Sequence, residues 1–134
     1  MNDCLFCKII NGEIPSYTIY ENDLVKVFLD INPSTNGDSL IIPKKHFNTI
    51  EDIEIDTLKE LDKVKQIIYP LLKQKLNCEG LTFVQNNDLG QDIKHFHIHA
   101  TPRYKNDLIS HDFNKETLKN IEETFETINK KDFI

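Results

Sequence analysis

The sequence lacks several features that would point to particular classes of protein. It has no tryptophan, one methionine and only four glycines among 134 residues. Its longest apolar runs, such as residues 40–42, fall far short of the ~20 residues of a membrane-spanning helix. The stretch that begins Met1-Asn2-Asp3 has neither the basic start nor the apolar core of a secretory signal. We therefore expect a cytoplasmic protein that does not associate with membranes.

Positive charge is also scarce. The chain has 16 basic residues against 22 acidic ones, a net charge of −6, and Arg103 is its single arginine. Nucleic-acid-binding proteins usually show a clustered basic excess, so we predict no nucleic acid partner. The acidity is local, because residues 51–62 alone carry a net −5 whereas residues 90–105 carry +2. The overall charge therefore does not exclude a small anionic ligand near residues 90–105.

Length and hydrophobic content predict one globular domain over residues 1–134. Hydrophobic residues make up 39% of the chain and charged residues 28%, as in ordinary soluble proteins. A chain of this size can bury a substantial core. No Ser/Gly-rich linker and no repeat divides the sequence.

Periodicity predicts an α+β fold with a mostly antiparallel five-stranded sheet. The long helix is indicated by apolar residues every three to four positions, and Pro70 inside it predicts a kink or break near Tyr69. The expected elements are a short helix at 4–10, strands at 18–21, 24–30, 40–42, 81–85 and 96–100, a long helix at 55–76, and a C-terminal helical extension at about 112–130 with Leu118, Ile121, Phe125 and Ile128 on one face.

Three of the five histidines, His95, His97 and His99, alternate along one expected strand. Alternate residues of a strand point to the same face, about 6.6–6.8 Å apart. Histidine suits acid–base, nucleophilic and metal chemistry near neutral pH. Either the row binds a metal through His-x-His, or one imidazole is a nucleophile while the others hold an anionic group. A row of ~13 Å is too long for all three to meet one ion, so we expect the histidines to divide these tasks.

The loop before the histidines could serve the second chemistry. Gly90 permits close backbone approach to a phosphate, Gln91 can orient a leaving group or a water molecule, and Asn86 adds an amide donor. The chain has no Gly-x-x-x-x-Gly-Lys-Ser/Thr element and no Gly-x-Ser-x-Gly element. A P-loop nucleotide triphosphatase is therefore excluded, and a serine hydrolase is disfavoured.

Cys4 and Cys7 form a C-x-x-C pair at the start of the chain. A structural disulfide is improbable in the cytosol, and a redox pair normally follows a β-strand. Zinc needs two further ligands, for which His46 and His95 are the natural candidates. Two free thiols on a partly buried helix are the alternative. Cys78 is expected to be a packing or surface residue, and His111 to be solvated.

Residues 90–101 resemble the signature of the histidine triad (HIT) family, His-φ-His-φ-His-φ-φ preceded by Gly-Gln. The likeness continues through residues 6–15, 28–33 and 40–46, and covers most of residues 4–104. Similarity to the Hint-like branch implies a HIT-like α+β fold that dimerises through a continuous sheet. It also implies hydrolysis or transfer at the α-phosphate of purine nucleotide conjugates, either nucleoside phosphoramidates or dinucleoside polyphosphates.

The resemblance also implies roles for individual residues. His97 would be the nucleophile that forms a nucleotidyl-histidine intermediate, His99 would hold the phosphate or assist the leaving group, His95 would support the geometry, and Gln91 would position the leaving group or water. An AMP- or GMP-type nucleotide would contact Leu5, Phe6, Ile9, Phe28, Asp30, Ile31, Asn86, Gln91, His97 and His99. The chemistry would need no cofactor.

The resemblance also implies a structural zinc ion, because relatives that have the N-terminal cysteine pair bind one. Its ligands here would be Cys4, Cys7, His46 and His95, which would leave His97 and His99 for phosphate.

Two departures from the family pattern favour an alternative function. Asp38 stands where relatives often have a pocket histidine, and Asp92 stands where many have serine or threonine near the leaving group. Both add negative charge where a phosphate is expected. The alternative is a nucleotide-binding, zinc-stabilised interaction module with little or no turnover.

Overall fold

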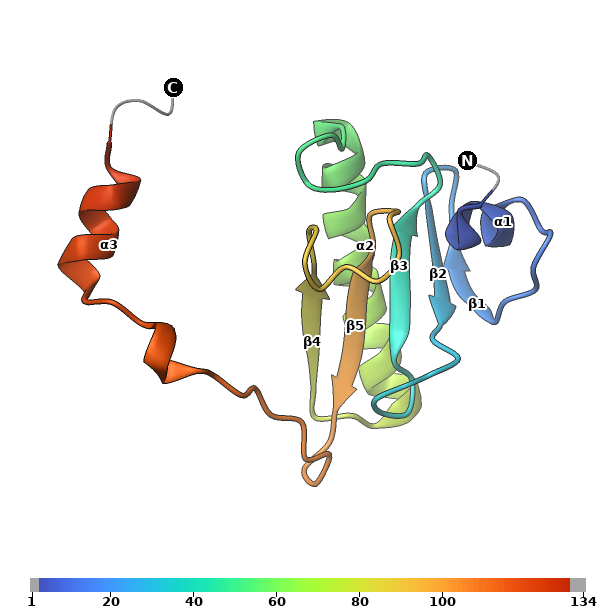
Figure 1. Ribbon diagram of the computed structural model, residues 1–134. Coiled ribbons are helices and arrows are strands. Elements are labelled where there is room, and N and C mark those ends of the chain that lie inside the picture. Colours follow the sequence, from blue (N-terminus) through green and yellow to red (C-terminus); the bar gives the residue numbers. More distant parts are fainter. Residues whose placement is uncertain (1–2, 131–134) are drawn as a thin grey trace.

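The computed structural model describes residues 3–130 and has an α+β fold (Figure 1). Its sheet has five strands in the order β1-β2-β3-β5-β4, and every neighbouring pair is antiparallel. No helix within residues 3–130 is long and apolar enough to cross a membrane. The elements are α1 (Leu5–Ile10), β1 (Thr18–Glu21), β2 (Val25–Leu29), β3 (Ser39–Pro43), α2 (Ile55–Leu76), β4 (Gly80–Gln85), β5 (Ile98–Arg103), a 3-10 helix η1 (Lys115–Thr117) and α3 (Ile121–Ile128).

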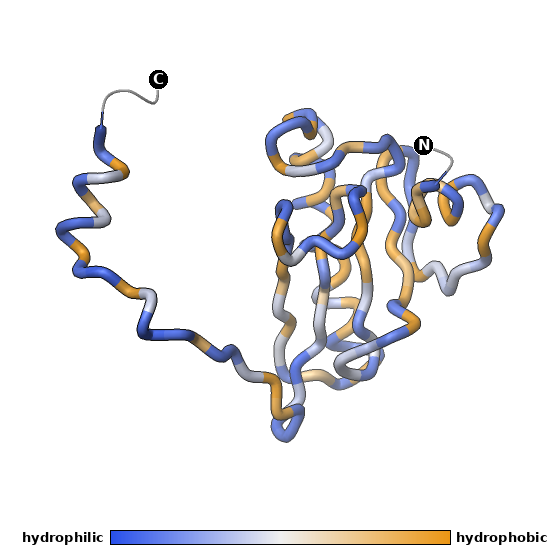
Figure 2. The backbone as a smooth tube through the Cα atoms, viewed as in Figure 1, coloured by the Kyte–Doolittle hydropathy of each residue, from blue (hydrophilic) through white to orange (hydrophobic). Residues whose placement is uncertain are grey.

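The two faces of the sheet are covered by different helices, and β3 is buried along its whole length between them. Figure 2 shows apolar residues concentrated in the strands and in the helix behind them. On one face α2 forms the main core with Val25, Val27, Ile41, Leu61, Val64, Ile68, Leu72, Phe96, Ile98 and Ala100. On the other face α1 forms a smaller core with Phe6, Ile9, Phe28, Leu40 and Ile42. Burial on both faces explains why residues 40–43 of β3 form an uninterrupted apolar run.

The strand predicted at 96–100 begins later, at Ile98, and continues to Arg103. The ladder with β3 stops because Pro43 has no N–H to donate, and the Phe96 amide instead donates to the Phe47 carbonyl at 2.7 Å. Of the three histidines, only His99 therefore lies in a regular strand. The predicted alternation still holds for the neighbours, since Phe96 and Ile98 face the α2 core.

The C-terminal extension is less helical than predicted for residues 112–130. It consists of η1 and α3, each capped by an asparagine side chain, and Leu118 lies between them rather than on the helix. All residues from 111 to 130 are exposed, and Figure 1 shows α3 well apart from the sheet. The predicted apolar face of the helix, formed by Ile121, Phe125 and Ile128, is therefore open to solvent.

Helix α2 runs through Pro70 without interruption, so a break near Tyr69 is wrong, and a kink there stays a prediction. Pro70 and Gln66, whose carbonyl would have accepted the missing hydrogen bond, are both exposed. Water can therefore satisfy that carbonyl, while Leu61, Val64 and Ile68 keep the helix packed on the sheet.

Replacing Pro70 by alanine should stabilise the protein. The substitution restores the hydrogen bond to the Gln66 carbonyl, and after allowance for the greater freedom of the unfolded chain we expect a gain of about 1–2 kcal/mol in the free energy of unfolding. Chemical denaturation measures the change. Gln66→Ala on the same exposed face is the control, with an expected change below about 0.5 kcal/mol. A Pro70→Ala variant no more stable than wild type would contradict the account.

Candidate functional site

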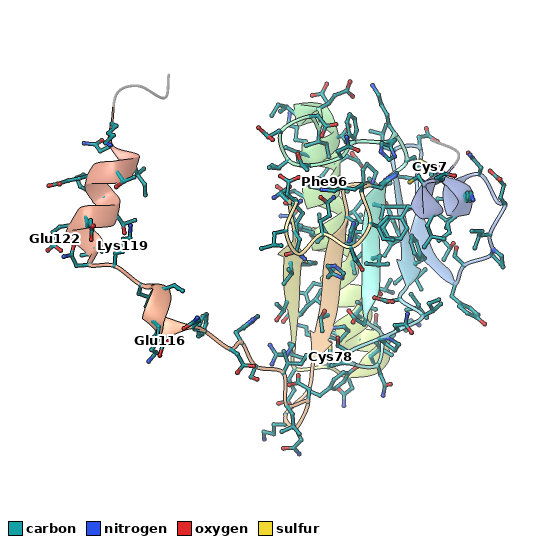
Figure 3. All side chains as sticks on the ribbon, viewed as in Figure 1. Cys7, Cys78, Phe96, Glu116, Lys119 and Glu122 are labelled. Carbon is teal, nitrogen blue, oxygen red and sulfur yellow. The ribbon has the colours of Figure 1, made fainter. Side chains whose placement is uncertain are left out.

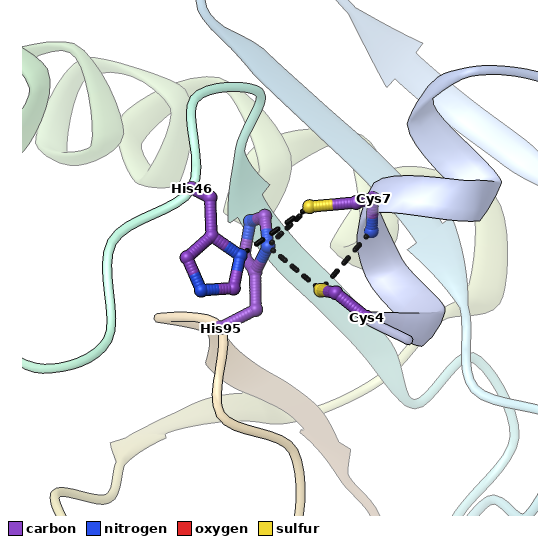
Figure 4. A group of neighbouring side chains, drawn as sticks. All are labelled: Cys4, Cys7, His46 and His95. Atoms are coloured by element: carbon purple, nitrogen blue, oxygen red, sulfur yellow. Dashed lines mark hydrogen bonds between the residues drawn. The ribbon is translucent and has the colours of Figure 1, made fainter. Parts of the chain in front are cut away.

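Two cysteines and two histidines meet at the N-terminal end of α1 (Figure 4). Cys4 caps α1, and its sulfur accepts a hydrogen bond from the Cys7 amide at 3.3 Å. Cys7 lies one turn later, so both thiols point the same way. His46 follows β3 and His95 precedes β5, and the four ligand atoms lie within 4.8 Å of one another. The structure therefore brings together all four residues of the predicted metal set.

Oxygen acceptors fix the tautomers of both histidines. The Nε2 atom of His95 donates to the Pro43 carbonyl at 2.8 Å, and Nε2 of His46 donates to the Asn48 side-chain oxygen at 3.0 Å. Each Nδ1 atom is then unprotonated and faces the sulfurs. The Nδ1 atom of His95 is 3.4 Å from the Cys4 sulfur and 3.6 Å from the Cys7 sulfur, and Nδ1 of His46 is 3.3 Å from the Cys7 sulfur.

This geometry fits a tetrahedral metal ion. Metal–sulfur bonds of ~2.3 Å and metal–nitrogen bonds of ~2.0–2.1 Å place sulfur and nitrogen ligands ~3.6 Å apart. Burial lowers the pKa of His95 to about 4, which keeps its imidazole neutral and able to coordinate. Burial and the neighbouring Cys4 raise the pKa of Cys7 to about 11, so its thiol stays protonated unless a cation is bound. The four residues form a possible Cys/His metal-binding group.

The remaining cysteine and an isolated histidine lie elsewhere. Cys78 is buried in the core beside α2, toward the opposite end of the sheet from Cys7 (Figure 3). His111 is exposed in the C-terminal extension. Both positions agree with the sequence expectations of packing and solvation.

A pocket of about 230 Å³ opens beside the metal-binding group, between α1 and the sheet. Its apolar wall combines α1 with the strand β2, and its polar end is formed by His97, His99 and Asp92. The lining residues are Leu5, Phe6, Ile9, Ile14, Pro15, Ser16, Phe28, Leu29, Asp30, Ile31, Asn32, Leu40, Asp92, Ile93, His97 and His99. Eight of the ten predicted nucleotide contacts are thus gathered around one cavity.

His97 is held so that its Nε2 atom faces the pocket beside the Asp92 carboxylate. Its Nδ1 atom donates to the His95 carbonyl at 2.7 Å, and its Nε2 atom lies 3.3 Å from Oδ1 of Asp92. The ring is 2% exposed and forms T-shaped contacts with Phe6 and His99, with ring centroids 5.1 Å and 5.0 Å apart. Burial lowers the pKa of His97, so the imidazole stays neutral near pH 7.

The pocket has less positive charge than the sequence indicated. Lys94 bonds Asp88 at 3.1 Å and Arg103 pairs with Asp107 at 2.7 Å, so neither cation faces the cavity. The described residues that line the pocket include Asp30 and Asp92 but no lysine or arginine. The expected +2 of residues 90–105 is therefore balanced locally.

Asp38 does not take the place of a pocket histidine. Its side chain is buried and accepts hydrogen bonds from the Thr101 hydroxyl at 2.8 Å and the Ser34 amide at 2.9 Å. Asp38 is not among the described residues that line the cavity. Its role is to fasten the turn before β3 to β5.

Asn86 and Gln91 also lie outside the described lining of the pocket. The Gln91 side chain bridges two loops, because it accepts from the Asp88 amide at 3.1 Å and donates to the Asn48 carbonyl at 2.7 Å. In this arrangement Gln91 holds the loop that carries Asp92.

Sequence reasoning missed the groups that orient the histidines. These are the carbonyls of Pro43 and His95 and the side chain of Asn48. Backbone carbonyls leave no mark in a residue pattern. The one available signal was the proximity of Asn48 to His46, a spacing at which a side-chain hydrogen bond is feasible.

Comparison with known proteins identifies the family. The HIT domain profile matches residues 11–106, so the chain belongs to the HIT domain family. A HIT-like protein of Methanocaldococcus jannaschii is 43% identical, covering 78% of this chain and 81% of that one. An adenylylsulfatase of Arabidopsis thaliana is 37% identical (81% and 56% of the two chains). An adenosine 5′-monophosphoramidase of Candida albicans is 38% identical (75% and 70%). Such relatives associate the family with nucleotide hydrolysis.

Solved structures agree with this fold. A HIT family protein of Bacillus subtilis superimposes with a TM-score of 0.80 at 30% identity, covering 96% of each chain. A zinc-bound histidine triad family protein of Mycobacterium smegmatis superimposes with a TM-score of 0.77 at 32% identity, covering 86% of each chain. The predicted HIT-like α+β fold is confirmed.

Substituting Asp38 by asparagine should destabilise the fold. The new amide nitrogen faces a donor in a site 5% exposed, so we expect a loss of about 1–3 kcal/mol in the free energy of unfolding. Thermal and chemical denaturation measure it. Asp112→Asn makes the same change in charge on the exposed extension and should leave stability unchanged. Equal stability of the two variants would show that the buried carboxylate is not structural.

Proposed function

We propose that this protein hydrolyses or transfers the nucleotidyl group of purine nucleotide conjugates by attack of His97 on the α-phosphate. The observation that carries the proposal is the position of His97 at the wall of the pocket, with Nδ1 held by the His95 carbonyl so that Nε2 is the nitrogen directed to a ligand. The relatives named as a monophosphoramidase and an adenylylsulfatase support adenosine nucleotides as the substrate class.

The chemistry divides into two displacements. The Nε2 lone pair of His97 attacks the α-phosphorus, a phosphorus–nitrogen bond forms, and the bond to the leaving group breaks with its electron pair. The leaving group takes up a proton, and His99 beside His97 is the proposed donor. Water then attacks phosphorus and gives its proton to the imidazole of His99, and the phosphorus–nitrogen bond breaks with its electron pair returning to His97, releasing the nucleoside monophosphate. Imidazole suits both halves, since it is a nucleophile when neutral and a leaving group when protonated.

The apolar part of the pocket is the proposed base site. Leu5, Phe6, Ile9, Phe28 and Ile31 surround a space that can exclude water from both faces of a purine. Asp30 is the proposed ribose ligand, and its carboxylate is positioned at the rim because Oδ1 accepts from the Asn32 amide at 2.9 Å. Asn86 and Gln91 remain proposed contacts that would require the 86–91 loop to approach the ligand.

A second candidate function is nucleotide binding with little turnover. It is favoured by Asp92, whose Oδ1 atom lies 3.3 Å from Nε2 of His97, where phosphorus would have to approach. Hydrolysis remains the preferred function because Asp92 is 74% exposed and its side chain can rotate away, whereas the tautomer of His97 is set by a buried hydrogen bond.

Replacing His97 by alanine should abolish turnover while purine monophosphate binding persists. We expect a loss of at least about a thousandfold in kcat on an adenosine phosphoramidate, because the covalent route is removed. Calorimetry with AMP and circular dichroism would show that the variant remains folded and binds.

The matched control is His111→Ala, which removes an exposed imidazole from the C-terminal extension. Its kcat should equal that of wild type. A His97→Ala variant with normal kcat would overturn the mechanism. Wild type that binds AMP but turns over neither phosphoramidates nor dinucleoside polyphosphates would select the binding function.

We also propose that Cys4, Cys7, His46 and His95 hold a structural zinc ion. Two sulfur and two nitrogen donors with oxygen acceptors behind the imidazoles are the ligand set and the surroundings that zinc prefers. When bound, the ion would tie α1 to the loops before and after the central strands, and so brace the wall of the pocket.

Metal analysis tests the zinc proposal. Reduced wild-type protein should contain about one zinc ion per chain, and chelation should lower Tm. Cys7→Ser should lose the metal. Cys78→Ala, which removes the thiol outside the cluster, should retain it. Metal-free wild-type protein with an unchanged Tm after addition of zinc would refute a structural ion.

A homodimer and a cytoplasmic location complete the proposal. Strand β4 forms one edge of the sheet and pairs with β5, and Val84 on it is partly exposed. Such an edge can extend the sheet into a second copy of the chain.

A further inference from the structure

A second group of metal ligands lies in the pocket itself, apart from the Cys/His group. It consists of Asp92, His97 and His99, with one ligand atom from each within 4.8 Å of the others. Two imidazoles and one carboxylate on one side of a cavity form a ligand set typical of divalent transition metals.

The orientation of each group suits coordination. The Nδ1 atom of His97 donates to a carbonyl, the arrangement that supports metal-bound histidines, and this turns Nε2 toward Asp92. The Oδ1 atom of Asp92 lies 3.3 Å from that Nε2, and two ligands on one tetrahedral ion lie ~3.3 Å apart. His99 is half-buried beside the ring of His97, and one of its ring nitrogens lies within 4.8 Å of the other two ligand atoms.

The charge of the pocket also favours a cation. Asp30 and Asp92 line it, and within the described lining there is no lysine or arginine to neutralise them. Lys94, the nearest cation in sequence, is bound to Asp88. The carboxylates of Asp30 and Asp92 would attract a divalent ion bound at Asp92. The ion would keep coordination positions open toward the cavity.

We propose that Asp92, His97 and His99 form a second, inhibitory binding site for a divalent transition metal ion. One lone pair cannot bind a metal and attack phosphorus at the same time, so a filled site stops the nucleophile of the proposed function. Mg²⁺, which prefers oxygen ligands, should not fill it. In this proposal Asp92 converts the pocket of a metal-independent enzyme into a metal-sensitive one.

Titration of zinc-loaded protein with Co²⁺ in the absence of nucleotide tests the site directly. We expect wild type to bind one further equivalent, with visible absorption from the new ligands and selective broadening of the His97 and His99 resonances. Asp92→Asn should weaken this binding at least tenfold. Asp112→Asn, which removes an exposed carboxylate from the C-terminal extension, should bind as wild type.

The absence of a further equivalent in wild type, or equal affinity in Asp92→Asn, would overturn the proposal. Binding is measured without turnover, so its result is independent of whether His97 is a nucleophile. Inhibition rests on the proposed function: Co²⁺ at saturation should reduce wild-type kcat at least tenfold and Mg²⁺ should not. Full activity with the site occupied would refute the inhibitory role alone.

Discussion

The hydrogen bonds of His95 are the constraint on which the site depends. Its ring donates to the Pro43 carbonyl and turns Nδ1 toward the two cysteines, while its own carbonyl accepts from Nδ1 of His97. His95 thereby determines which nitrogen is directed to a ligand in two places: its own Nδ1 faces the metal-binding group, and Nε2 of His97 faces the pocket. The end of the β3–β5 ladder makes this possible, because the Pro43 and His95 carbonyls are available to side chains where regular pairing stops.

Electrostatics explains how the two neighbouring groups can perform different tasks. Burial keeps the imidazoles of His95 and His97 neutral by lowering the pKa of each, so both act through lone pairs. The Cys/His group combines two thiols with two imidazoles, which suits a structural ion. The pocket adds Asp92 and opens to solvent, which suits a substrate or an exchangeable cation. Neutral histidine side chains thus suit a structural role in the Cys/His group and a chemical role in the pocket.

Local patterns predicted most of the fold. The long helix Ile55–Leu76 and the strands β1 and β4 follow from periodicity, and the α1 pair Cys4 and Cys7 with His46 and His95 was grouped correctly by ligand type. The pairing of segments that are distant in sequence could not be predicted. Pro43 shortens the strand that contains the histidines only because the two segments lie opposite each other in the sheet. The surroundings of charged side chains could not be predicted from the sequence for the same reason. Lys94 is turned to Asp88 rather than to the pocket, and the buried Asp38 is held by Thr101 across the sheet.

Nitrogen-15 NMR of the histidine side chains tests the central claim most directly, because long-range couplings identify which ring nitrogen carries the proton. The account predicts that His97 is the Nδ1–H tautomer at neutral pH, whereas His46 and His95 carry the proton on Nε2. The Nδ1 resonances of His46 and His95 should change chemical shift further when zinc is bound. A proton on Nε2 of His97 would contradict the account, since that nitrogen could then neither attack phosphorus nor bind a metal ion.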